Sequence, residues 1–63
     1  MRYFRIWKDD GKKEELAREE FVEKISHGRD MSVVIEAMEK GSLDGLPHSN
    51  KYETNFAIYE VER

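Results

Sequence analysis

The chain has 63 residues and no cysteine, so neither a disulfide bond nor a thiolate-bound metal ion can hold it together. At this length we expect a single domain over residues 1–63. Its core must consist of roughly two dozen apolar side chains, unless self-association into a homodimer supplements it. A buried catalytic site would compete with that core for the same residues, so we expect no enzyme and no catalytic residues.

Hydropathy and charge argue against two further classes of protein. No apolar run approaches the length of a membrane span, and no signal peptide is visible, so we expect a cytoplasmic protein without membrane contact. The net charge of −3 lacks the broad excess of lysine and arginine that proteins with many phosphate contacts carry. The bases are concentrated in residues 1–8, whereas residues 9–24 are acidic.

Two segments at opposite ends of the chain predict strands. Residues 2–8 are rich in aromatic and β-branched types and stop at the Asp-Asp-Gly sequence of residues 9–11, which indicates a tight turn. Residues 54–62 predict the second strand, because their side chains alternate between two faces that each include apolar residues. Residues 12–16 fit two elements, because Asp-Gly favours the second arm of a hairpin, whereas lysine and glutamate favour the first turn of a helix.

Both predicted strands are partly apolar on both faces, and a single helix covers only one face of a sheet. If the strands pair, we expect one face to pack against the helix and the other to need a partner or a covering loop. The face expected against the helix holds Phe4, Ile6, Phe56 and Ile58. The face expected to be uncovered holds the aromatic residues Tyr3, Trp7 and Tyr59.

The middle of the chain predicts one clear helix. In residues 17–26, Ala17, Phe21 and Ile25 recur at four-residue spacing, and Gly28 follows as a residue that can end the helix. On the charged side, Glu20 and Lys24 are spaced for an ion pair within the helix.

Two later segments are harder to assign. Residues 31–38 fit both a helical stripe and an alternating strand; the β-branched run of residues 33–35 favours a strand, whereas the sequence of residues 36–40 favours a helix. Residues 41–54 are rich in turn-forming types and have no period, so we expect a long loop that is a candidate binding element.

Together these elements predict an α+β fold: a small antiparallel sheet of three or four strands with one main helix packed on one face. The alternative is a β-α-α-β order with residues 31–40 helical.

The sequence has no motif for catalysis, a metal ion or a cofactor. Its two histidines, His27 and His48, lack ligand spacing, and we expect the first at a helix end and the second in a solvated loop. The neighbouring serines do not make these histidines a nucleophile–base pair, because such sites are assembled in space with an orienting carboxylate. The four glycines match no phosphate-binding pattern.

Two groups of residues are candidates for binding a partner. The first strand places Tyr3, Arg5 and Trp7 on one face, a composition found both in protein hot spots and in platforms that stack single-stranded bases, and Tyr59 joins that face if the strands pair. The second group, Glu15, Glu19 and Glu23, forms a ladder of like charges at four-residue spacing on the predicted helix. Such a ladder is either a solvated helix face or a site that a basic groove on a partner receives.

The expected function is that of a small non-catalytic protein-binding module. We expect an inhibitor or adaptor of the phage or mobile-element type, which acts on a host protein by occluding its surface, including the case of a basic nucleic-acid-binding groove. One alternative is a nucleic-acid-associated regulator with Arg2, Arg5, Lys8 and Trp7 as contacts, although the overall acidity argues against nucleic acid. Another is a structural homodimer with the aromatic face buried between subunits.

Overall fold

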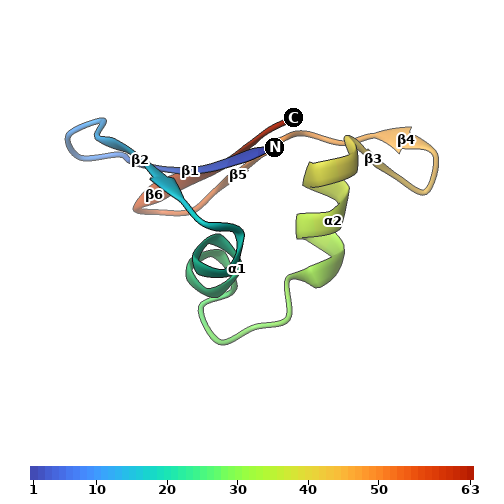
Figure 1. Cartoon of the computed structure of the whole chain (residues 1–63), viewed down its shortest axis with the longest axis horizontal. Coiled ribbons are helices and arrows are strands. Elements are labelled where there is room, and N and C mark those ends of the chain that lie inside the picture. The colour runs from blue at the N-terminus through green and yellow to red at the C-terminus, as the bar shows by residue number, and fades with distance from the viewer.

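A computed structural model describes all 63 residues and confirms the α+β fold. A four-stranded antiparallel sheet has the order β2-β1-β6-β5, and both helices lie on one of its faces (Figure 1). The elements are β1 (Arg2–Trp7), β2 (Lys13–Leu16), α1 (Arg18–Ser26), α2 (Ser32–Lys40), β3 (Ser42–Leu43), β4 (Leu46–Pro47), β5 (Lys51–Glu53) and β6 (Ala57–Glu62). Neither helix is long and apolar enough to cross a membrane.

Strands β1 and β2 form a hairpin around the predicted turn, so residues 13–16 belong to the sheet and not to the helix. The backbone N–H of Gly11 donates to the carbonyl of Trp7 at 2.8 Å, and the N–H of Lys12 donates to the Asp10 side chain at 2.9 Å. The helix predicted for residues 17–26 is confirmed, with Phe21 and Ile25 buried beneath the sheet.

The strand favoured for residues 31–38 is wrong, because α2 occupies Ser32–Lys40. The helical stripe prevails: Met31, Ile35 and Met38 are all buried on one side of the helix. The Asp30 carboxylate accepts hydrogen bonds from the backbone and hydroxyl of Ser32 at the start of α2. The alternative with two helices therefore replaces the single main helix. The β-branched residues are accommodated in α2 because tertiary burial outweighs their weak local preference for a strand.

The long loop predicted for residues 41–54 is also partly wrong. Strands β3 and β4 form a small hairpin, and both residues of its turn, Asp44 and Gly45, have positive φ angles (52° and 79°) as tight hairpins require. Residues 51–53 form β5, which pairs with β6 and places Tyr52 opposite Tyr59. The hairpin projects beyond α2 at one end of the molecule (Figure 1).

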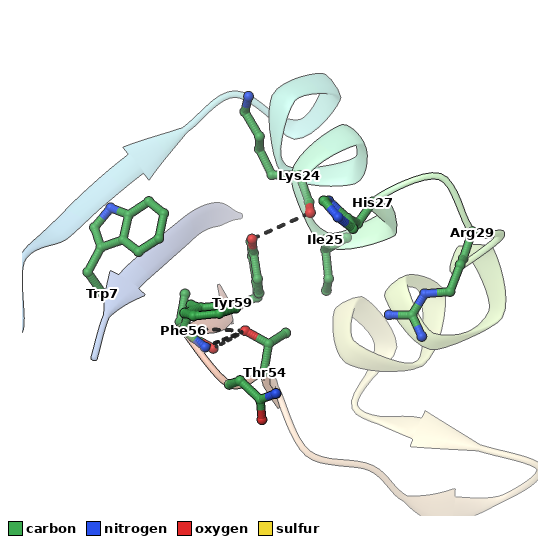
Figure 2. Close-up of a pocket in the computed structure, with 10 residues that line it drawn as sticks. Trp7, Lys24, Ile25, His27, Arg29, Thr54, Phe56 and Tyr59 are labelled. Carbon is green, nitrogen blue, oxygen red and sulfur yellow. Dashed lines mark hydrogen bonds between the residues drawn. The ribbon is translucent and has the colours of Figure 1, made fainter. Parts of the chain in front are cut away.

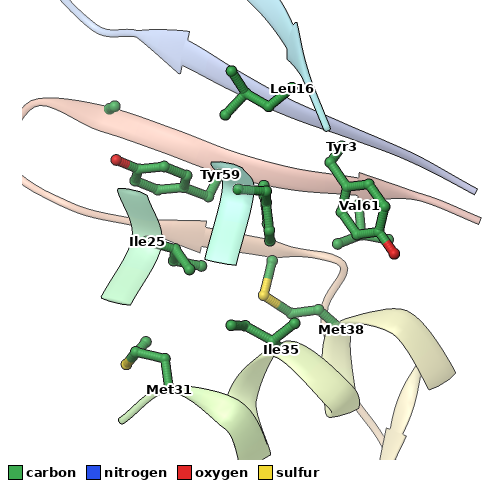
Figure 3. Packing of buried hydrophobic residues seen from close by; sticks show 10 residues of the cluster. Tyr3, Leu16, Ile25, Met31, Ile35, Met38, Tyr59 and Val61 are labelled. Atoms are coloured by element: carbon green, nitrogen blue, oxygen red, sulfur yellow. The ribbon is translucent and has the colours of Figure 1, made fainter. Parts of the chain in front are cut away.

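The predicted assignment of the two sheet faces is reversed. Tyr3 and Tyr59 face the helices (Figure 3). Their ring centroids lie 5.1 and 5.9 Å from that of Phe21. Both tyrosine hydroxyls have partners there: Tyr3 donates to Glu39, and Tyr59 donates to the carbonyl of Lys24 at 3.4 Å. The aromatic face of Tyr3, Trp7 and Tyr59 is thus largely covered within one chain, and a homodimer is not needed to bury it.

The opposite face of the sheet carries no helix and is covered by charged side chains. Phe4 is only 6% exposed, because the guanidinium of Arg2 and the ammonium of Lys13 lie over its ring, 5.1 and 4.3 Å from the centroid. Arg2 pairs with Glu15 at 3.0 Å, and Lys13 pairs with Glu60 at 3.8 Å. The aliphatic stems of these bases shield the apolar residues while their charges remain in water.

A polar cluster of three residues, Tyr3, Arg18 and Glu39, joins the sheet to both helices. The Glu39 carboxylate accepts from the Tyr3 hydroxyl and from Arg18 Nε, the latter at 2.8 Å. The hydrogen bond from Arg18 holds the pKa of Glu39 below its usual value, and burial raises the pKa of Tyr3. This cluster fixes the relative positions of β1, α1 and α2 through a charged acceptor.

Candidate functional site

The structure does not bring the seven predicted binding residues together. Tyr3 and Tyr59 are buried in the core. The three-carboxylate ladder is wrong, because Glu15 lies on β2 in an ion pair with Arg2, and only Glu19 and Glu23 remain on α1, both exposed.

Trp7 lies at the end of β1 and borders a groove that the sequence did not predict as a site, and Arg5 precedes it by two residues on the same strand. The groove lies between Trp7, the end of α1 and the turn that leads into β6, and has a volume of about 360 Å³ (Figure 2). We call it the aromatic groove, and its apolar lining is formed by Trp7, Ile25, Phe56, Ala57 and Tyr59. This volume is at the lower end of the range of about 300–1,000 Å³ for ligand pockets, so the groove is large enough for a few side chains.

Trp7 is held in place by Arg5 and Glu14. The indole Nε1 donates to Glu14 Oε1 at 3.0 Å, and the Arg5 guanidinium lies 4.5 Å from the centroid of the indole. Arg5 also pairs with Glu14 at 2.6 Å, and this hydrogen bond lowers the pKa of the glutamate. The indole is therefore oriented before any ligand arrives, which reduces the entropy lost on binding.

The backbone of Phe56 is also held in place, and the residue is 75% exposed. The Thr54 hydroxyl accepts from the backbone N–H of Ala57 at 3.1 Å and of Phe56 at 3.3 Å, and the carbonyl of Phe56 accepts from the N–H of Lys8 at 2.9 Å. The prediction that Phe56 packs against the helix is wrong, because the strand begins one residue later, at Ala57, and Phe56 lies in the preceding turn. The Thr-Asn sequence before Phe56 is the local signal for that turn.

The rim of the aromatic groove is basic at the end of α1. Lys24, His27 and Arg29 line it there, and the Arg29 guanidinium points back towards the groove (Figure 2). Neither Lys24 nor Arg29 takes part in an ion pair, so the pair predicted between Glu20 and Lys24 does not form. Asp9 lines an adjoining cleft beside Trp7 and Phe56 together with Lys8. The charge of Lys8 is matched by Glu53, whereas Asp9 takes part in no ion pair, so the unmatched charge at this end is acidic.

The bases predicted to contact nucleic acid are placed differently. Arg2, Arg5 and Lys8 each lie in an ion pair with a glutamate. Their charges are thus matched within the chain, and a nucleic acid would have to compete with these carboxylates.

The histidines and acids form no cluster suited to a metal ion. No group of three or more His, Cys, Asp or Glu side chains is close enough to hold one. His27 lies at the end of α1 as expected, in the left-handed conformation (φ 46°), and His48 lies in the connection after β4, with Nδ1 2.8 Å from the carbonyl oxygen of Ser49.

Comparisons with protein-family models, with curated proteins and with solved structures found no match.

Proposed function

We propose that this protein is a small, non-catalytic protein-binding module and that the aromatic groove is its binding site. The observation that carries the proposal is the exposed Phe56 ring, held on a hydrogen-bonded turn beside the oriented indole of Trp7. Aromatic side chains dominate the binding energy of protein interfaces, and rigid aromatic anchors lose little entropy when a partner binds. Exposing a large apolar ring to water is unfavourable, and a partner that covers Phe56 would remove this cost.

Binding itself is the activity that we propose, as in an inhibitor that occludes a partner or an adaptor that holds one. The groove supports this proposal because its lining residues offer apolar contact area and positive charge. The acidic side of α1 supports it less, since the ladder that we expected there lacks Glu15. The paired state of Arg2, Arg5 and Lys8 makes a nucleic-acid regulator the weaker alternative.

The test is the substitution Phe56→Ala, compared with Leu46→Ala in the β3–β4 hairpin. Leu46 is 69% exposed and lies outside the groove, so both variants remove a similarly exposed apolar side chain. We expect Phe56→Ala to lower the affinity for the captured partner about thirty-fold, as the loss of an interface hot spot does, and Leu46→Ala to leave it unchanged. Partners are captured from cell lysate by photo-crosslinking, and their affinity is measured with the purified proteins.

Two results would count against this proposal. Equal binding by wild type and Phe56→Ala would reject the aromatic groove as the site. Failure of the wild-type protein to capture any partner, in lysates of several possible hosts, would reject the protein-binding function itself.

A further inference from the structure

We infer that the aromatic groove binds an acidic peptide segment with one aromatic or large aliphatic anchor, and that the acidic residues stand on one side of that anchor. This inference rests on the proposed function and specifies the chemistry of the partner. The anchor occupies the apolar space between Trp7, Ile25 and Phe56, and the acidic side chains reach the basic rim.

Charge complementarity supports the acidic segment. The whole chain carries a net charge of −3, yet Lys24 and Arg29 both line the groove and neither takes part in an ion pair. By contrast, Lys8, at the other end, pairs with Glu53. The α1 side of the groove therefore carries two unmatched positive charges, which favours acidic partners and disfavours basic ones.

The arrangement of charge along the groove supports the one-sided pattern. Asp9 lies at the end of the groove opposite Lys24 and Arg29, beside Trp7 and Phe56. An acidic residue of the peptide at that end would be repelled by Asp9. Acidic residues are therefore favourable on one side of the anchor alone.

The contribution of α1 to the groove favours a peptide over a nucleotide. Helix α1 approaches the groove with its C-terminal end, marked by Lys24, Ile25 and His27, and not with its N-terminus. Phosphate sites commonly combine basic side chains with the free backbone N–H groups of a helix N-terminus or a glycine-rich loop, and α1 supplies only the side chains here. Carboxylates on a flexible peptide can instead reach the long side chains of the rim.

The experiment uses the full chain and four synthetic peptides of about ten residues, in which Gly and Ser flank the variable part. Two peptides carry Glu-Asp-Glu either before or after a central Phe, one carries Lys-Arg-Lys on both sides of Phe, and one carries Glu-Asp-Glu on both sides of Ala. Trp7 is the only tryptophan of the chain and lines the groove, so its fluorescence reports binding directly.

We expect one of the two acidic Phe peptides to bind at least about tenfold more tightly than the other three probes. Equal binding by the basic peptide would overturn the inference about charge and leave the protein-binding function intact. Equal binding by the Ala peptide would overturn the anchor, and equal binding by both acidic Phe peptides would overturn the one-sided pattern. AMP serves as a further probe, and its binding in preference to the peptides would overturn the choice of partner class.

A matched pair of variants tests the basic rim. The double variant Lys24→Glu/Arg29→Glu should lose about tenfold or more in affinity for the preferred peptide. The double variant Lys40→Glu/Lys51→Glu changes the net charge by the same amount at exposed bases outside the groove and away from Trp7, and should bind as the wild type does. If both variants lose affinity equally, net charge and not the rim is responsible, and the inference is wrong.

A second measurement needs no peptide. The ratio of iodide quenching to caesium quenching of Trp7 reports the sign of the charge around the groove. We expect this ratio to fall in Lys24→Glu/Arg29→Glu and to stay near the wild-type value in Lys40→Glu/Lys51→Glu. An unchanged ratio in the first variant would mean that Lys24 and Arg29 do not set the potential at the groove, which would overturn the inference.

Discussion

The variant Phe21→Ala is expected to be largely unfolded at room temperature. Phe21 has no exposed surface, and its ring lies between those of Tyr3 and Tyr59. Removing a buried phenylalanine costs about 3–5 kcal/mol, and the core of a domain this small rarely provides more than about 3–5 kcal/mol. Circular dichroism during urea titration should therefore show no cooperative transition, or one shifted close to zero denaturant.

Phe56→Ala is the matched control for this prediction, because it makes the same substitution at a residue that is 75% exposed. We expect its free energy of unfolding to stay within about 0.5 kcal/mol of the wild-type value. This result would also show that the loss of binding predicted for Phe56→Ala does not come from unfolding. Equal destabilisation by the two variants would contradict the placement of Phe21 at the centre of the core.

The variant Glu39→Ala is expected to lower the free energy of unfolding by about 1–3 kcal/mol. The substitution removes the acceptor of the Tyr3 hydroxyl, which is largely buried, and the partner of Arg18. Glu36→Ala is the control on the same helix, since Glu36 is exposed and pairs only with Lys40 on the surface. Surface pairs contribute little, so Glu36→Ala should shift the urea midpoint much less than Glu39→Ala.

The same carboxylate makes stability depend on pH in the acidic range. The hydrogen bond from Arg18 lowers the pKa of Glu39 in the folded state, so the unfolded chain binds its proton first as the pH falls. The stabilisation is complete above the unfolded pKa of about 4.5 and is lost below it. Urea titrations between pH 3 and 7 should show a shallower dependence for Glu39→Gln than for the wild type. Identical slopes would mean that Glu39 has the same pKa in both states.

Elements with a local signal were predictable from the sequence, and elements decided by tertiary packing were not. The β1–β2 turn and α1 follow from short-range patterns, namely Asp-Gly and the four-residue spacing of Phe21 and Ile25. Helix α2 does not follow from local preference, because the β-branched residues 33–35 favour a strand and compete with the helical spacing of Met31, Ile35 and Met38. Gly41, which ends α2 in the left-handed conformation (φ 78°), was a usable signal for the helix.

The two sheet faces could not be told apart by alternation, because both are apolar. The difference lies in what surrounds each face. Tyr3 and Tyr59 can be buried since their hydroxyls reach Glu39 and the backbone of α1. Phe4 can lie away from the helices since Arg2 and Lys13 cover it. These contacts join residues that are far apart in the sequence.

The candidate site was predictable only in part, for the same reason. Trp7 is indicated by its residue type and its place in the first strand. The sequence instead indicates a core face for Phe56, an ion pair for Lys24 and no role for Arg29. The groove combines the end of β1, the end of α1 and the turn before β6, and no single segment indicates it.

The pairing of β1 with β6 separates the chain ends from the groove. Arg2 lies opposite Glu62 at one end of this strand pair, and Trp7 lies opposite Ala57 at the other, about 17 Å along the strands. Both termini thus emerge side by side, away from the groove (Figure 1). A fluorescent protein, an affinity tag or a surface tether fused at either end would therefore leave the groove open, and a short linker between the ends would yield a circular chain with the same site.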